Sequence, residues 1–300
     1  MKSVASVKDR LNNRSKATGK TMQELLTVYG LERTVYRLSI SRYKENFTLK
    51  GGILLYAIFD GDYSRATTDI DLLAQKISND TEEMERIFSE VFSIETDDPL
   101  RFDLDTLVVK SITEFRKYHG VNVSILAYLD RTRIEVSIDI GFDDVVYPER
   151  VEMSFPVILD DENPQVYAYS LYSAIAEKFE AIVSLAYDNS RFKDYYDIYV
   201  LSTTHDFSGD ELSSAIKETF YNRKTSVSRI VAFSDGFAND PLRRSRWKSF
   251  VKKKKALLPI SLEDTIRSIQ QFLGPVAESI AQDESFSGKW SHDEQKWMAE

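Results

Sequence analysis

Three aspartates have the spacing of carboxylates that could hold metal ions together. Asp69 and Asp71 lie in the alternating segment 69–73 (DIDLL), and Asp139 lies in a second alternating segment, residues 134–140 (IEVSIDI). Residues two apart in a strand share a face, so Asp69 and Asp71 are expected to point the same way. In the second segment the even positions are apolar, which leaves Asp139 on the polar face. Asp139 is therefore available to join the first pair.

The chemistry that such a cluster supports is metal-dependent transfer. Carboxylates held close together repel one another unless cations lie between them, and three of them can hold two divalent ions for phosphoryl or nucleotidyl transfer. An Asp-x-Asp pair by itself also occurs in hydrogen-bonded turns, at solvated strand edges and in glycosyltransferases. The chain has no cysteine and three histidines. Oxygen ligands, which magnesium and manganese prefer, are therefore indicated.

A glycine turn precedes the acidic pair by about one helix and one loop. A short strand is predicted to end at Lys50, followed by Gly51-Gly52 and an apolar helix over residues 53–59. The amides at a helix start, together with close approach at glycine, create a place where a phosphate could bind. The alternative is that the two glycines only make a tight connection between strand and helix.

A second charged constellation lies further along the chain. Lys178 falls within an apolar helical stripe in residues 168–188, which is costly for a lysine unless it meets a carboxylate or a phosphate. Asp194 and Asp197 are three apart on the next predicted helix and so share a face. Helix capping by Asp194 and an ion pair from Lys193 to Asp197 would explain these acids without a functional role.

Composition and charge limit the classes of protein to consider. The 300 residues are 42% hydrophobic, which is enough for a sizeable core, and no apolar run approaches the ~20 residues needed to cross a bilayer. With no signal-peptide pattern at the N-terminus, a cytoplasmic protein without membrane contact is expected. Residues 1–50 hold eleven basic residues against four acids, residues 51–170 hold ten against twenty-five, and residues 240–255 hold eight against one. Basic flanks around an acidic centre fit a protein that gathers polyanions and holds cations in a cleft, although solvated helix faces would look the same.

Periodicity predicts the elements that must position these residues. Helices are expected over 4–18, 21–40 and 80–92, strands over 105–110, 121–129 and 133–140, and a hairpin turn at Asp130-Arg131. From Ala168 the pattern is helical almost to the end. The predicted organisation is a pair of N-terminal helices (1–45), a mixed α/β core (46–165) and a helical C-terminal lobe (166–300).

Four motifs in one order resemble the AbiEii/AbiGii toxin family of nucleotidyltransferase-like proteins. They are residues 49–73, 100–107, 134–148 and 177–201, and the resemblance runs from about Val4 to Val251. It implies an α/β (α+β) fold in which a polymerase-beta-like nucleotidyltransferase core with a mixed sheet carries a helical second lobe, the nucleotide lying between the two.

The resemblance also implies roles for residues around the glycine turn. Lys50, Gly51 and Gly52 would hold the triphosphate, with Thr67 beside it. The sequence departs from the family pattern at Thr67-Thr68, where a serine and an acid often stand.

The acidic and later motifs receive roles in the same way. Asp69 and Asp71 would bind Mg²⁺ or Mn²⁺, and Asp139 would act as general base or as a third metal ligand. Lys178 would neutralise phosphate charge. The closing charged cluster of the last motif is matched by Arg191, Lys193, Asp194 and Asp197.

The implied activity is that of a type IV toxin of abortive infection and phage defence. Such a toxin would transfer a nucleoside monophosphate from a nucleoside triphosphate to an acceptor, expected to be tRNA, and would be paired with an antitoxin encoded nearby. Two other functions stay open from the residues: a kinase-like or glycosyl-transferring enzyme, and a non-catalytic nucleotide-binding regulatory protein with the same fold.

Overall fold

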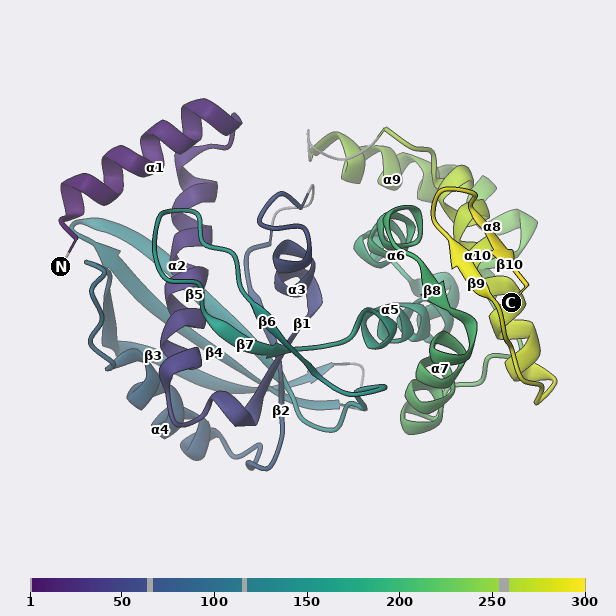
Figure 1. The fold of residues 1–300 in the computed structure, drawn as a ribbon, viewed down its shortest axis with the longest axis horizontal. Helices are drawn as coiled ribbons and strands as arrows, with labels where there is room; N and C mark the ends of the chain where they lie inside the picture. The colour runs from purple at the N-terminus through teal and green to yellow at the C-terminus, as the bar shows by residue number, and fades with distance from the viewer. Residues whose placement is uncertain (1, 64–66, 115–117, 254–258, 300) are drawn as a thin grey trace. The chain divides into compact units, whose positions relative to one another are not determined.

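The computed structural model describes residues 2–63, 67–114, 118–253 and 259–299 (Figure 1). The chain forms two compact units. Unit 1 comprises residues 1–143 and 150–168, and unit 2 comprises residues 144–149 and 169–300. Within the described residues, no helix is both long enough and apolar enough to cross a membrane.

Unit 1 begins with two helices, α1 (Val4–Thr18) and α2 (Met22–Ile40), at the positions that periodicity predicts. Ser3 caps α1 by accepting the Ser6 amide, and Gly19 ends it in the left-handed conformation. Thr21 and Glu24 form a reciprocal capping box at the start of α2. The start and end of α1 and the start of α2 are therefore encoded by residues at those positions in the sequence.

A seven-stranded mixed sheet follows, in the spatial order β3-β4-β5-β2-β1-β7-β6. The strands are β1 (Phe47–Lys50), β2 (Ile70–Ala74), β3 (Arg101–Glu114), β4 (Tyr118–Leu129), β5 (Thr132–Gly141), β6 (Val151–Ser154) and β7 (Gln165–Ala168). The pairs β2–β5 and β1–β7 are parallel, and the other neighbours are antiparallel. The predicted hairpin turn is confirmed, since Leu129 pairs with Thr132 across it and Asp130 has φ 58°.

The core of unit 1 covers one face of this sheet. Alternate residues of β4 and β5 are buried, and α2 packs on β5 while α4 (Thr81–Phe92) packs on β3 and β4. The other set of alternating side chains is mostly half-buried or exposed and includes Asn122 and Asp139. The short helix α3 (Gly51–Ile58) joins β1 to the loop before β2 and is buried from Gly52 to Ala57. At β4 and β5 the sheet therefore has a packed face and an accessible, more polar face, whereas at β1 and β2 the second face is covered by α3.

Unit 2 is mainly helical. Its helices are α5 (Leu171–Leu185), α6 (Phe192–Thr204), α7 (Gly209–Arg223), α8 (Asp235–Asn239), α9 (Pro241–Lys253) and α10 (Leu262–Ala281). Helix α5 packs against α6 and α7, and α10 packs against α6. A buried ion cluster braces α5 and α7, because Arg223 pairs with Glu177, Glu180 and Asp144. Single 3-10 turns lie at Lys44–Asn46, Ala186–Asp188 and Val231–Phe233.

Five short strands are absent from the sequence-based predictions. These are β6 and β7 in unit 1 and three strands of unit 2, β8 (Phe207–Ser208), β9 (Lys289–Ser291) and β10 (Lys296–Met298), which form a small sheet in the order β10-β9-β8. Each has two to four residues, which is too few to show a period of two. The C-terminal hairpin is held by Trp290, which is fully buried and donates its indole N–H to the Ser202 carbonyl at 2.7 Å. The prediction of a helical lobe almost to the chain end therefore missed this hairpin.

Candidate active site

Asp69, Asp71 and Asp139 converge on the accessible face of the unit 1 sheet. Asp71 on β2 is the direct register partner of Asp139 on the neighbouring parallel strand β5, and Asp69 immediately precedes β2. One carboxylate oxygen from each residue lies within 4.8 Å of the other two, and all three side chains are half-buried. The predicted proximity of the three acids is confirmed. An all-oxygen donor set of this kind is suited to a hard divalent cation.

The acids belong to a row of residues that crosses four strands. Lys50 on β1 pairs in register with Asp71, Asp71 pairs with Asp139, and Asp139 pairs with Asn122 on β4. Side chains at directly paired positions lie on one face of a sheet, on strands about 4.8 Å apart. Lys50 and Asn122 therefore flank the carboxylates on opposite sides.

Gly51 lets the start of α3 approach Asp71 closely. Its φ is +65°, and a Cβ added there would lie 1.9 Å from Asp71 Oδ2. The next amide, Gly52 N–H, donates to the same oxygen at 3.2 Å. The predicted strand, glycine turn and helix are confirmed. The two glycines do more than connect strand to helix, because they also position Asp71. Any larger residue at 51 would displace the Asp71 carboxylate.

Asn122 is a site residue that the sequence analysis missed. Its Nδ2 donates to Asp139 Oδ1 at 2.7 Å and to Ser137 Oγ at 2.9 Å. The first bond holds the Asp139 carboxylate from β4, on the other side of β5 from the strand that carries Asp71. The sequence could have indicated Asn122. A two-residue turn at Asp130-Arg131 sets the register of the hairpin and so places residue 122 opposite residue 139.

Thr67 lies next to the carboxylates but faces the backbone. Its side chain is buried, and its hydroxyl donates to the Asp69 carbonyl at 3.2 Å. Thr68 Oγ1 is 3.4 Å from Asp69 Oδ1. Both threonines therefore shape the segment that carries Asp69. A place for Thr67 beside a triphosphate stays a prediction.

Lys178, Asp194 and Asp197 come together inside unit 2. Lys178 Nζ on α5 is 2.8 Å from Asp197 Oδ2 and 3.6 Å from Asp194 Oδ1, both on α6. The two aspartates are buried and share a helix face as predicted, and Lys178 is only 9% exposed. The sequence predicted that Lys178 meets either a carboxylate or a phosphate, and in the structure it pairs with the Asp197 carboxylate. A phosphate contact by Lys178 remains a prediction.

Arg191 extends this cluster at the start of α6. Its Nε donates to Asp194 Oδ2 at 2.8 Å, so Asp194 is placed between two cations. Lys193, two residues after Arg191 on the first turn of α6, is half-buried. The sequence-predicted residues thus form two clusters, one in each unit: the acids with Lys50 to Gly52 in unit 1, and Lys178 with the charged residues of α6 in unit 2.

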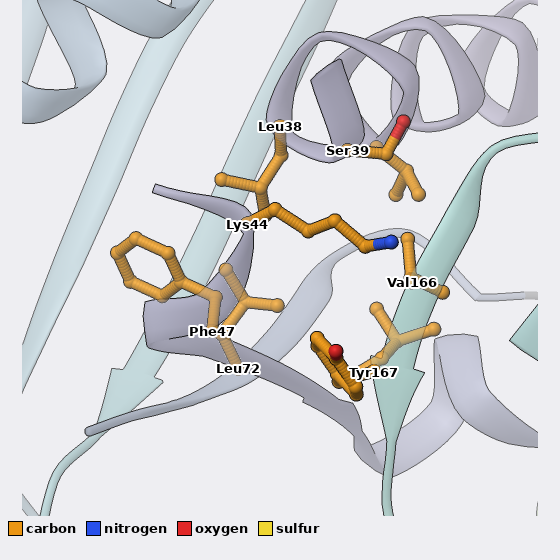
Figure 2. Close-up of a pocket in the computed structure, with 9 residues that line it drawn as sticks. Leu38, Ser39, Lys44, Phe47, Leu72, Val166 and Tyr167 are labelled. Atoms are coloured by element: carbon orange, nitrogen blue, oxygen red, sulfur yellow. The ribbon is translucent and has the colours of Figure 1, made fainter. Parts of the chain in front are cut away.

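A narrow, mainly apolar pocket lies in unit 1 (Figure 2). It is lined by nine residues: Val35, Leu38, Ser39, Lys44, Phe47, Leu49, Leu72, Val166 and Tyr167. Leu72 follows Asp71 along β2, so the two side chains point to opposite faces of the sheet. The pocket therefore belongs to the packed face beneath α2 and contains none of the predicted site residues.

The family to which these motifs belong is shown by comparison. A family model described as nucleotidyl transferase AbiEii toxin, type IV toxin-antitoxin system, matches residues 33–274, which is most of the chain. The protein is thus a nucleotidyltransferase. It belongs to the AbiEii family of toxins, whose systems pair the toxin with an antitoxin.

Two solved structures from Helicobacter pylori are similar to the chain over most of its length. One is JHP933, with 17% identity, 88% of this chain and 94% of that chain covered, and a TM-score of 0.48. The other is described as a candidate nucleotidyltransferase, with 17% identity, 88% and 97% coverage, and a TM-score of 0.48. No curated protein matches the chain.

Proposed function

We propose that this protein transfers a nucleoside monophosphate from a nucleoside triphosphate to RNA, with tRNA as the acceptor. The observation that supports the proposal most is the convergence of Asp69, Asp71 and Asp139 within 4.8 Å on paired parallel strands. In this reaction an acceptor hydroxyl oxygen bonds to the α-phosphorus, the bond to the β-phosphate oxygen breaks, and pyrophosphate leaves. Because the proposed substrates are a nucleoside triphosphate and tRNA, we propose that the reaction takes place in the cytoplasm.

The three carboxylates are proposed to hold Mg²⁺ or Mn²⁺. When bound, such ions neutralise charge on the triphosphate and orient the reacting oxygens. Asp71 is kept in place by the Gly52 amide, and Asp139 is kept in place by Asn122. Asp139 is the proposed acceptor for the proton of the attacking hydroxyl, and its Oδ1 stays hydrogen-bonded to Asn122 as the proton arrives.

The nucleotide phosphates are proposed to meet basic and backbone groups next to the acids. Lys50 lies on β1 opposite Asp71, and Gly51 and Gly52 begin α3, with the Gly52 amide donating to Asp71. Thr67 is proposed to lie beside the triphosphate. From unit 2 we propose further phosphate contacts by Lys178, Arg191 and Lys193, with Asp194 and Asp197 holding the Lys178 ammonium in position.

As a type IV toxin the protein has an antitoxin partner, and we propose that its activity serves phage defence by abortive infection. Modification of tRNA would stop growth by halting translation. The antitoxin would relieve this block when both proteins are present.

A labelling experiment tests the reaction class. Purified protein is incubated with total RNA and, in turn, each α-labelled or γ-labelled nucleoside triphosphate. Transfer predicts α-label in a tRNA-sized band and none from γ-label. Asp69→Asn, which keeps the side-chain size but removes its charge, is the matched control and should give no label. Label from the γ-phosphate would replace the proposal with a kinase activity, and a wild-type protein that labels no RNA would end the tRNA proposal.

A further inference from the structure

The two basic stretches of the chain differ in how their charges are used. On α1 and just before it, Lys2 pairs with Asp161, Lys8 pairs with Asp130 at 3.4 Å, and Arg10 pairs with Asp160. These three cations are paired with acids of unit 1, whereas Arg14 and Lys16, also on α1, are exposed and have no ion pair among the described residues.

Helix α9 uses its charges differently. Six of its thirteen residues are basic and none is acidic. Arg244, Arg246, Lys248 and Lys252 are exposed, and within the part of the chain that the structure describes none of them makes an ion pair. Such a concentration of unneutralised charge on one helix is repulsive, so it is stabilised when an anionic partner binds.

The spacing of these cations suits an extended polyanion. Arg244, Lys248 and Lys252 follow one another at intervals of four residues, so they form one stripe with steps of about 6 Å along the helix. Arg246 is two residues from both Arg244 and Lys248, about 200° around the helix, so it is exposed but lies outside this stripe. A row of cations contacts successive charges of a linear chain better than it contacts a compact anion.

The opposite face of α9 fixes the helix firmly to α6. Trp247 is 1% exposed, donates its indole N–H to the Ile260 carbonyl at 2.9 Å, and meets the Phe192 ring edge-on at 5.7 Å. Phe250 contacts Phe192 and Tyr196. The basic stripe is thus held rigidly next to the helix that carries Asp194 and Asp197.

A further contact ties α9 to the segment before α6. The Arg243 guanidinium donates to the carbonyls of Asn189, at 3.1 Å, and Tyr187. It also lies over the Phe237 ring at 4.1 Å. Arg243 therefore has a structural role, which separates it from the four exposed cations.

We infer that the exposed basic stripe of α9, made of Arg244, Lys248 and Lys252, binds the phosphate backbone of the acceptor RNA. The inference rests on the proposed function for the identity of the polyanion. Each cation neutralises one phosphate and releases condensed counterions, so the contacts contribute affinity without base preference.

Two other anionic partners fit this surface less well. A helix that binds a lipid surface needs a large exposed apolar face, whereas the aromatic residues of α9 are turned into the core of unit 2. Protein interfaces are depleted of lysine at their centres and depend on exposed aromatic anchors. On α9 the exposed face is mostly charge and serine, which are the groups that contact phosphates.

The test compares two triple variants with the same loss of charge. Arg244→Gln/Lys248→Gln/Lys252→Gln removes the stripe, and Arg42→Gln/Arg267→Gln/Lys296→Gln removes three exposed cations that pair with acids elsewhere. Both are built on Asp69→Asn protein, and tRNA binding is measured by fluorescence anisotropy from 50 to 300 mM salt. The α9 variant should bind at least tenfold more weakly near 150 mM salt. Its slope of log affinity against log salt should decrease by about 2 to 3, since each phosphate contact contributes roughly 0.7 to 0.9. The control variant should stay within about threefold of the parent.

The result that overturns the inference is equal binding by the two triple variants, or an unchanged salt slope in the α9 variant. Thermal melting checks that both are folded. A loss of polyglutamate binding as large as the loss of RNA binding would assign α9 to an acidic protein instead.

Binding is measured without nucleotide on an inactive background, so it does not depend on the transfer reaction. Transfer of label by wild-type protein together with normal RNA binding by the α9 variant would overturn this inference alone. Weak RNA binding by the α9 variant together with no transfer by wild-type protein would overturn only the proposed function.

Discussion

Asn122 Nδ2 donates a hydrogen bond to Asp139 Oδ1 at 2.7 Å, across the β4–β5 hairpin. The bond orients a carboxylate that has Asp71 as its register partner on the other side. Without it, Asp139 would be free to rotate away from the other two acids. Asn122 is thus a positioning residue for the proposed metal site.

Replacing Asn122 with leucine, which has a similar size, should lower the transfer rate about tenfold to a hundredfold. A hydrogen bond to a charged acceptor contributes about 1.5 to 3 kcal/mol, and its loss here affects the orientation of Asp139. The measurement is kcat together with its Mg²⁺ dependence, which should shift to higher concentration. Ser124→Ala, on the same face of β4 but outside the carboxylate row, is the control. An unchanged Mg²⁺ dependence in Asn122→Leu would exclude the positioning role.

Gly51→Ala should damage both stability and activity. The positive φ costs a non-glycine residue about 1 to 2 kcal/mol, and the new Cβ would collide with Asp71 Oδ2. Denaturant unfolding should show a loss of at least 1 kcal/mol, and the transfer rate should fall severely. Gly236→Ala provides a matched control, because a Cβ there meets nothing within 4 Å. That variant should be neutral or slightly more stable. Full activity in Gly51→Ala would show that Asp71 need not occupy its observed position.

Asp69→Ala should abolish growth inhibition and transfer while leaving the fold intact. The side chain is half-buried, and its removal relieves repulsion from Asp71 and Asp139, so the free energy of unfolding should change by no more than about 1 kcal/mol. Growth on induced expression is compared with thermal melting of the purified protein. Undiminished toxicity from a stable Asp69→Ala protein would contradict an enzymatic mechanism.

Lys178→Met should lose stability, because the change leaves Asp197 buried and without this partner. The expected cost is about 3 to 5 kcal/mol of unfolding free energy. The double variant Lys178→Met/Asp197→Leu removes both charges and should recover most of the lost stability, since an apolar pair can replace a buried ion pair.

Nucleotide titration of the double variant then tests the proposed phosphate role. Weak triphosphate binding by a double variant of normal stability would support a role for the pair in binding phosphate. Normal binding and turnover would leave Lys178 and Asp197 with a structural role only.

Glu32 should make stability depend on pH. Burial raises the pKa of Glu32 from 4.5 to about 8, although Arg33 lies 3.3 Å away. Between these two values the folded state holds a proton that the unfolded chain releases. Stability from this group is therefore fully present below about pH 4.5 and is lost as the pH rises toward 8.

Glu32→Gln isolates this effect. Glutamine keeps an acceptor for the Ile158 amide, which donates to Glu32 at 2.7 Å, but cannot ionise. Guanidinium unfolding at pH 5 and pH 8 should show a smaller decrease in stability for the variant than for the wild type. Equal decreases in both proteins would mean that Glu32 is already ionised in the folded state at pH 5.

Local chemistry in the sequence was enough to predict α1, α2, the turn from β1 to α3 and the β4–β5 hairpin. Capping residues and helical periodicity act within a few positions, and Asp130-Arg131 closes its hairpin through neighbours in the chain. The same alternation placed Asp69 with Asp71 and put Asp139 on the polar face of its strand. A two-residue turn also determines the register of its hairpin, so the position of Asn122 was within reach of the sequence.

Only the tertiary structure decided that β2 and β5 are neighbours and that Asp71 lies opposite Asp139. No local pattern specifies a parallel pairing between strands more than sixty residues apart in the chain, because it depends on which faces the helices bury. The pairing of Lys178 with Asp197 was likewise a matter of packing between α5 and α6, since the stripe on α5 predicted only that the lysine needs a partner. The short strands of the C-terminal hairpin have too few residues to encode a period. They are stabilised by distant contacts, such as the bond from Trp290 to Ser202, which exist only once the chain has folded.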